Sequence, residues 1–167
     1  MVAIPFFLMI FSILELGIVF ILNSVLETAT TDTGRLLRTG QAQAQAFDKA
    51  RFKSELCSRM ALFENDCTNR ATIDVRVIPQ FALTDEDREE PITDGALDSS
   101  KTTYDAGGPT SLVLVRVWYP HPLMTPFLSQ SVSRIGNGKV LLTAATAFRN
   151  EEFPAIIPPA SPPGSPS

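Results

Sequence analysis

An almost uncharged apolar segment at the beginning of this sequence restricts its possible folds more than any other feature. Residues 1–22 read MVAIPFFLMIFSILELGIVFIL and contain one charged side chain, that of Glu15. As an α-helix the segment would be about 33 Å long, enough to cross a hydrocarbon layer of about 30 Å. A secretory signal peptide needs a basic start, and a domain of this size rarely buries a helix that is apolar all round. We therefore predict a transmembrane helix over residues 1–23.

Composition divides the rest of the chain into unlike parts. The 167 residues are 44% hydrophobic and 19% charged, with a net charge of −4. Six of the 13 prolines lie within residues 154–167, which predicts an extended Pro-rich tail. These values exclude a coiled-coil rod, a collagen-like chain, a cysteine-rich scaffold and a basic nucleic-acid binder. We expect no nucleic acid among the partners.

The negative charge is concentrated in an irregular stretch, residues 82–108. Residues 85–105 carry eight acidic and two basic side chains, whereas the rest of the chain carries ten acidic and twelve basic ones. Asp85, Asp87 and Glu89 alternate, but no glycine turn and closing glutamate complete a calcium loop. We interpret the stretch as a solvated acidic loop; a cation or partner site is the alternative.

Helical periodicity continues beyond the apolar segment. Residues at spacings of three and four form a stripe: Leu22, Leu26, Ala29, Thr33, Leu36, Gly40, Ala44 and Phe47. The stripe predicts an amphipathic helix continuing over residues 24–53, with small residues that allow close packing against a sheet or another helix. The threonine-rich run 28–33 and two glycines are poor helix formers, so we expect a bend or local melting near residues 28–40. A linker at 28–34 is the alternative.

Alternating polar and apolar residues predict strands in the second half of the chain. The strands are expected at 72–77, 111–119 and 140–148, with Pro109 and Pro120 bracketing the second and a turn at 136–138 before the third. The sequence therefore predicts an α+β fold, in which one long N-terminal helix accompanies a small antiparallel sheet within a domain at residues 54–153.

Catalytic motifs are missing from the sequence. The single histidine, His121, lies in a Tyr-Pro-His-Pro turn, and Gly136-Asn-Gly-Lys139 lacks the pattern of a phosphate-binding loop. We therefore expect a structural or interaction protein that is not an enzyme and uses no cofactor, metal or small-molecule substrate.

Two signals disagree about which side of the membrane the domain occupies. Cys57 and Cys67 lack further zinc ligands and form either a disulfide, which favours an oxidising periplasm, or two unrelated buried thiols. Arg35 and Arg38 follow the span, and by the positive-inside rule they favour the cytoplasm.

Motifs in a particular order along the chain carry a family resemblance. They are Pro5-Phe6-Phe7-Leu8, Ile13-Leu14-Glu15-Leu16-Gly17, Leu26-Glu27-Thr28-Ala29, residues 35–43, Phe52 to Cys57, Cys67, Asp74-Val75-Arg76-Val77, residues 105–109, residues 113–117, Tyr119-Pro120 and Ala144 to Glu151. Over roughly residues 5–153 the chain resembles TadE-like proteins, the pseudopilins or minor pilins of the bacterial tight-adherence (Tad) system.

This resemblance implies a single-pass protein of the bacterial inner membrane, with a pilin-like fold and its C-terminal domain in the periplasm. It implies a role in assembling an adhesive pilus, with other pilins, the inner-membrane assembly platform and membrane lipid as partners, and leaves open whether the protein enters the extracellular filament. The family carries a prepilin cleavage motif ahead of its apolar helix, and Glu15 does not match the acidic residue of that motif. We expect instead that Glu15 pairs with a polar group of a neighbouring subunit. The alternative function is a membrane-anchored periplasmic binding domain without a filament role.

Overall fold

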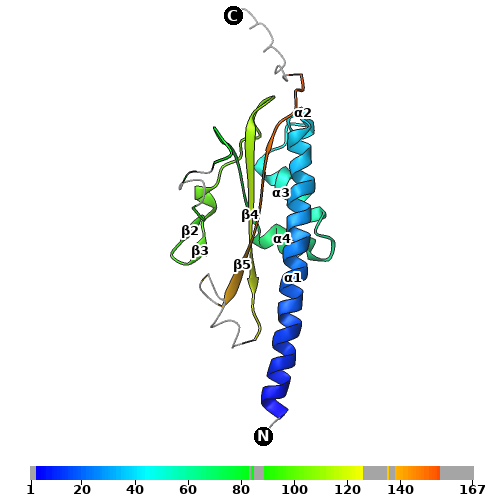
Figure 1. Ribbon diagram of the computed structural model, residues 1–167, viewed down its shortest axis with the longest axis vertical. Coiled ribbons are helices and arrows are strands. Elements are labelled where there is room, and N and C mark those ends of the chain that lie inside the picture. The colour runs from blue at the N-terminus through cyan, green and yellow to red at the C-terminus, as the bar shows by residue number, and fades with distance from the viewer. Residues whose placement is uncertain (1–2, 83, 85–88, 126–134, 136–137, 155–167) are drawn as a thin grey trace, which may run out of the picture.

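The computed structural model describes residues 3–82, 84, 89–125, 135 and 138–154. One long helix lies along a small antiparallel sheet, with shorter helices and a hairpin beside them (Figure 1). In chain order the elements are α1 (Ala3–Arg38), α2 (Gln41–Ala44), α3 (Lys49–Ser58), η1 (Ala61–Phe63), α4 (Glu64–Arg70), β1 (Thr72–Val77), β2 (Ile92–Thr93), β3 (Ala96–Leu97), η2 (Ser99–Lys101), β4 (Leu112–Pro122) and β5 (Lys139–Arg149). The predicted α+β class, with its N-terminal helix and small antiparallel sheet, is confirmed.

Helix α1 is continuous through the threonine-rich segment, where we expected a bend or a linker. The hydroxyl groups of Thr28, Thr30, Thr31 and Thr33 each donate a hydrogen bond of 2.7–2.9 Å to the carbonyl oxygen four residues earlier. Thr30 and Thr33 are therefore buried without an unpaired hydroxyl. Packing against the sheet stabilises the helix here and outweighs its low intrinsic propensity.

The helix ends at Arg38 and does not continue to residue 53 as expected. Gly40 has a φ of 76°, in the left-handed region that glycine adopts without steric cost, and the chain turns there into α2 and then α3. Asp48 caps α3 by accepting a 2.7 Å hydrogen bond from the backbone N–H of Arg51. Residues 24–53 thus form the end of one helix, then α2 and the first half of α3. The division of the chain into domains stays a prediction.

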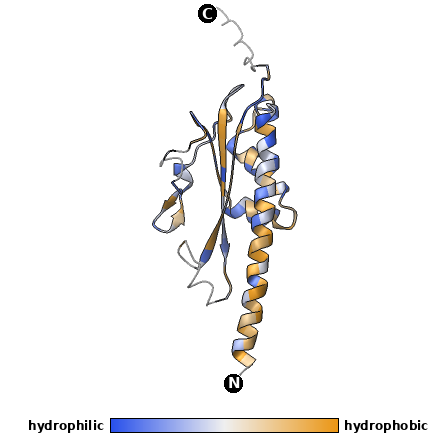
Figure 2. Cartoon of the chain, in the orientation of Figure 1, coloured by the Kyte–Doolittle hydropathy of each residue, from blue (hydrophilic) through white to orange (hydrophobic). Residues whose placement is uncertain are grey.

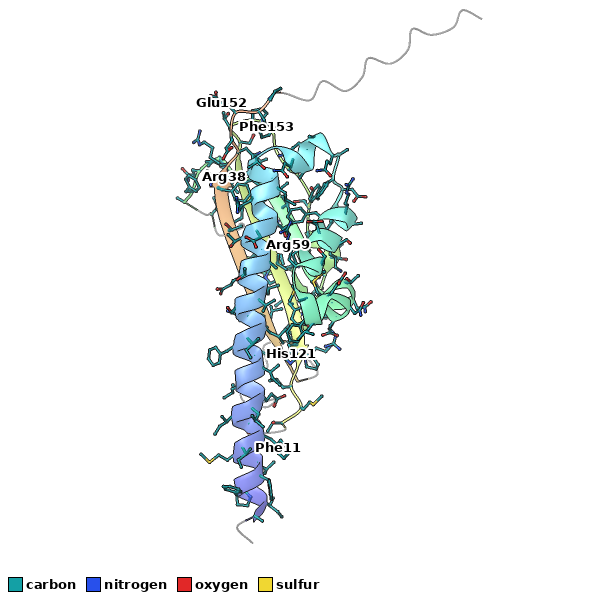
Figure 3. All side chains as sticks on the ribbon, turned by 90° about the vertical axis from the view of Figure 1, so that its right-hand side faces the viewer. Phe11, Arg38, Arg59, His121, Glu152 and Phe153 are labelled. Carbon is teal, nitrogen blue, oxygen red and sulfur yellow. A yellow bond between two sulfur atoms is a disulfide. The ribbon has the colours of Figure 1, made fainter. Side chains whose placement is uncertain are left out.

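The segment after β5, residues 150–153, holds the end of α1, and we call it the C-terminal strap. The backbone N–H of Glu151 donates to the carbonyl oxygen of Arg38 at 2.9 Å, and the two side chains form an ion pair of 3.2 Å. A Cβ atom on Gly40 would lie 2.6 Å from the ring of Phe153. Figure 3 shows Arg38 and Phe153 at this end of the molecule. The strap therefore closes over the point where α1 stops.

Strand β4 lies in the middle of the sheet, between β1 and β5. All pairings are antiparallel, and Val115 lies opposite Val75 on one side and Thr146 on the other. The three predicted strands are confirmed, but β4 continues past Pro120, which we expected to end it. Strand β1 pairs only as far as Trp118, so β4 has a single neighbour at Pro120, and a proline without an N–H is tolerated at such an edge.

The two faces of the sheet pack against different elements. One face covers the C-terminal half of α1 and includes Val113, Val115, Val117 and Tyr119 of β4. On the other face, Trp118 and Leu141 are buried beneath Ile92 and Leu97 of the β2–β3 hairpin. The main core therefore lies between the sheet and the helices, which fixes the position of α1 along the strands.

The acidic stretch 82–108 contains regular structure that we did not predict. Strands β2 and β3 pair through a tight turn in which Asp94 and Gly95 have φ angles of 51° and 74°. Residues 83 and 85–88 of this stretch, positions 136–137 of the predicted turn and residues 155–167 of the predicted Pro-rich tail lie outside the described residues. The solvated-loop interpretation therefore stays a prediction for 83 and 85–88.

Candidate assembly and membrane surface

The first half of α1 is an apolar surface that the described part of the chain leaves largely uncovered (Figure 2). We call residues 3–21 the apolar half of α1. Its exposed large side chains, each 37–73% exposed, are Ile4, Phe6, Phe7, Leu8, Met9, Ile10, Phe11, Ile13, Leu14, Leu16, Ile18, Phe20 and Ile21. Helix α1 is the one helix among the described residues that is long and apolar enough to cross a membrane.

From Leu22 onward the same helix is buried in the domain. Leu22, Leu26 and Ala29, three of the predicted packing residues, are at most 1% exposed and belong to the main core. Further along, Gly34 allows β5 to approach the helix closely, because a Cβ atom there would lie 3.0 Å from the ring of Phe148. The helix therefore changes from an open surface to a core element at about residue 22.

The remaining predicted packing residues lie in different environments. Gly40 is buried, Leu36 and Phe47 are half-buried, and Ala44 is exposed. Ala42 occupies the buried position in α2, where it is 1% exposed. The stripe does not continue in phase because α2 begins a new helix after Gly40, with its own orientation.

Glu15, the single charged residue of the apolar half, finds its partners within its own chain. Its carboxylate accepts hydrogen bonds from the backbone N–H groups of Met124 and Thr125, the latter at 2.9 Å. The side chain is consequently buried, with the residue 9% exposed. These contacts arise because the chain after β4 continues alongside α1 down to the level of Glu15. The expected pairing of Glu15 with a neighbouring subunit stays a prediction. Sequence reasoning gave no signal for Met124 and Thr125.

An open groove of about 510 Å³ lies between the apolar half of α1 and the end of β4 with the residues that follow it. It is lined by Leu8, Phe11, Leu14, Glu15 and Ile18 from the helix, and by His121, Pro122, Met124 and Thr125 from the other side. In Figure 3, His121 lies beside the middle of α1, with Phe11 nearer the N-terminal end. Burial lowers the pKa of His121, and among the described lining residues Glu15 carries the one carboxylate.

The two cysteines form a disulfide. Cys57 at the end of α3 and Cys67 in α4 have Cα atoms 5.5 Å apart, within the normal range for a bridge, and both are fully buried. The alternative of two unrelated thiols is therefore wrong. The bridge holds the two short helices together beside α1.

A buried ionic cluster, which we did not predict, joins β1 to β4. Asp74 is fully buried and accepts hydrogen bonds from the side chains of Arg76 and Arg116, both at 2.8 Å, and from the backbone N–H of Thr103, also at 2.8 Å. Burial disfavours the carboxylate, but these bonds outweigh it and hold the pKa of Asp74 below its ordinary value. The alternating pattern of the strand had marked Asp74 only as a polar position.

A second cleft, of about 530 Å³, is basic. Lys49, Lys53 and Arg70 line it, and burial together with the neighbouring Lys49 lowers the pKa of Lys53. Arg70 pairs with Asp66 at 3.2 Å. Within the described ranges no group of three His, Cys, Asp or Glu side chains is placed to hold a metal ion.

Comparison with known proteins gives one match. No curated protein and no solved structure matches the chain. The model of the family described as TadE-like protein matches residues 1–35, a segment that contains the whole apolar half of α1 and its first buried turns. Over these residues the chain matches the TadE-like protein family, the family that its sequence resembles.

Proposed function

We propose that this protein is a membrane-anchored pseudopilin or minor pilin that acts, through contacts with other proteins, in the assembly of a Tad-type adhesive pilus. One observation carries the proposal: the segment that matches the family model contains the apolar half of α1, which the rest of the described chain leaves open. A continuous exposed apolar surface of this size marks a site of membrane or protein contact.

Before assembly, lipid would cover the apolar half of α1. Residues 3–21 rise about 28 Å along the helix axis, close to the thickness of a hydrocarbon layer of about 30 Å. The protein would thus be a single-pass protein of the bacterial inner membrane. A periplasmic position of the domain is supported by the disulfide between Cys57 and Cys67, because such bonds persist in oxidising compartments.

During assembly, other pilins and the inner-membrane assembly platform would replace lipid on this surface. Lipid tails are as apolar as leucine, so moving the helix from lipid to a bundle of helices exchanges one apolar environment for another. How closely the helices pack against one another then decides whether they associate. No small-molecule substrate or cofactor enters this function.

A paired substitution in the native bacterium tests the proposal. Phe20 on α1 and Leu62 in η1 are both large apolar side chains, 73% and 95% exposed. We expect deletion of the gene to abolish surface pili, Leu62→Asp to restore them, and Phe20→Asp not to restore them. Membrane fractionation of both strains separates loss of anchoring from loss of assembly. Normal piliation after deletion would overturn the proposal.

The alternative, a membrane-anchored periplasmic binding domain, is favoured by the basic cleft around Lys49 and Lys53. It would leave piliation intact in the deletion strain. If this alternative holds, Lys53→Glu would impair binding at the basic cleft. If the protein is a pilin, the Lys53→Glu variant would still assemble pili.

A further inference from the structure

We propose that the segment at the end of β4, residues 122–125, enters the lipid layer beside α1, with Met124 against acyl chains and Glu15 holding the segment in place. This inference rests on the proposed membrane anchoring and adds a second lipid-contacting element to it.

The depth of this segment follows from the helix. Leu16, Ile18, Phe20 and Ile21 lie on the domain side of Glu15 and are 38–73% exposed. If the lipid layer ended at Glu15, these four side chains would face water. If lipid covers them, Glu15 lies six residues, or about 9 Å, below the edge of the apolar surface. The segment bonded to Glu15 then lies at the same depth, which is the depth of interfacial elements that penetrate about 5–10 Å.

The backbone N–H groups of the segment are suited to that depth. An unpaired N–H group in a lipid layer costs several kcal/mol, so non-helical backbone is tolerated there only when its polar groups are bonded. Pro122 has no N–H, the N–H of Leu123 donates to the carbonyl of Gly138 at 3.0 Å, and those of Met124 and Thr125 donate to Glu15. All the N–H groups from 122 to 125 are thus satisfied within the chain.

The side chains agree with this placement. Met124 is 90% exposed although it is large and apolar, and it lies beside the open groove along the apolar half of α1. Lipid is the occupant that the geometry favours, because the exposed surface of the segment is continuous with that of the proposed spanning helix. The contact also explains how a carboxylate is tolerated in the span. The N–H groups that donate hydrogen bonds to Glu15 enter the membrane together with it.

Depth-dependent fluorescence quenching of the full-length protein tests this inference. The protein, with its native disulfide intact, is reconstituted into vesicles of phosphatidylethanolamine and phosphatidylglycerol that carry bromine at shallow acyl positions. An environment-sensitive label is placed at Met124→Cys, at Phe7→Cys as a helix control, and at Leu62→Cys, which is also highly exposed but lies in η1. We expect brominated lipid to remove most of the emission at positions 124 and 7 and to leave position 62 unchanged.

The outcomes separate the inference from the function on which it rests. Quenching at position 7 without quenching at 124 overturns the inference and leaves the anchoring intact. No quenching at position 7 overturns the anchoring, and the inference with it. Emission at 124 that falls with protein density and not with brominated lipid would place a second copy on this surface, which also overturns the inference.

A second variant tests the holding role of Glu15. Glu15→Leu removes both acceptor oxygens, so we expect the label at 124 to lose its quenching while the label at 7 keeps it. Unchanged quenching at 124 in this variant would overturn the role of Glu15. Glu15→Gln keeps one carbonyl acceptor, so quenching at position 124 in this variant should lie between that of the unchanged protein and that of Glu15→Leu.

Discussion

Two arginines bind the side chain of Asp74. Its carboxylate accepts from Arg76 and Arg116, and the Arg116 guanidinium also lies over the ring of Trp118, with its carbon 4.9 Å from the ring centre. Removing one partner of a buried ion pair is costly because the other charge remains buried and is less well compensated.

Asp74→Asn is accordingly expected to lower the free energy of unfolding by about 3–5 kcal/mol. Since the pKa of Asp74 is depressed in the folded state, its contribution is present above its ordinary pKa of about 4 and is lost as the pH falls through the lower folded value. Denaturant unfolding of the full chain in detergent, at neutral and acidic pH, measures both effects. Glu64→Gln, at an exposed position, is the control and should change stability by less than about 0.5 kcal/mol. Equal losses in the two variants would contradict the role of Asp74.

Sequence reasoning located important residues better than it located their partners. The apolar surroundings of Glu15 predicted that its carboxylate needs compensation, and this followed from the cost of a charge in a membrane. Its partners, 109 and 110 residues away, are backbone N–H groups, which carry no sequence signature. Asp74 was missed for a different reason, because the burial of a polar strand face depends on which other elements cover it.

Helix α1 and strand β5 lie close together at Gly34, where little space is left for a side chain between them. A Cβ atom there would lie 3.0 Å from the ring of Phe148 and 3.3 Å from Thr146. Gly17 in the same helix has nothing within 4 Å of the corresponding position. The two glycines therefore form a matched pair for testing helix–sheet packing.

Gly34→Leu is expected to lower the free energy of unfolding by about 1–3 kcal/mol, because overpacking forces the strand and the helix apart. Gly17→Leu introduces the same side chain into open space and should leave the stability of the isolated protein unchanged or raise it by up to about 1 kcal/mol through helix propensity. Thermal unfolding of both variants in the same detergent gives the comparison. Equal melting temperatures would show that β5 does not restrict this helix face.

The link between α3 and α4 depends on the disulfide. Replacing both Cys57 and Cys67 by serine is expected to reduce stability by roughly 2–3 kcal/mol, from the loss of a constraint on the unfolded chain. The change appears as a lower melting temperature, and gel mobility with and without reductant after thiol blocking reports the bond itself. Free thiols in the protein isolated from cells would also remove an argument for the periplasmic position.

Secondary structure was predictable where periodicity decides it. The three long strands were found because each has an alternating or fully apolar pattern, and the helix because it is apolar over five turns. The end of α1 was not predicted. The three- and four-residue spacing of the stripe continues through Gly40, although the backbone leaves the helical conformation there. The β2–β3 hairpin carried a usable signal, Asp94-Gly95, which favours a tight turn, but its strands are only two residues each.

Taken as a whole, the molecule is asymmetric along α1: one half of the helix lies in a core and the other is open. The exposed position at Gly17 becomes important only if other helices cover the open half. Small residues let helix backbones approach closely, and a leucine would keep them apart.

We therefore expect Gly17→Leu to remove most surface pili while the amount of protein in the membrane stays unchanged and its melting temperature does not fall. Gly17→Ala is the control and should retain piliation, since one methyl group is more easily accommodated. Pili counted by electron microscopy, with immunoblots of membrane fractions, give the measurement. Normal piliation in Gly17→Leu would exclude close helix packing at this position.

The arrangement of the parts was the least predictable level. Composition separated the apolar helix, the mixed domain and the acidic stretch, because those differences are local. How far the sheet reaches along the helix is set by pairing between segments distant in sequence, such as β4 with β5 and Glu15 with the segment after β4. No local pattern records these contacts.

The C-terminal strap has a mechanical consequence. Strands β4 and β5 run lengthwise along α1, and the strap that bonds to Arg38 follows β5 directly (Figure 1). A pull along the helix axis reaches β5 through the buried face of α1 and also through the contacts of Arg38 with Glu151. It then loads the hydrogen bonds between β4 and β5 in shear, all together, and does not open them one after another. The longest strand pairing of the sheet thus shares the tension applied to the helix.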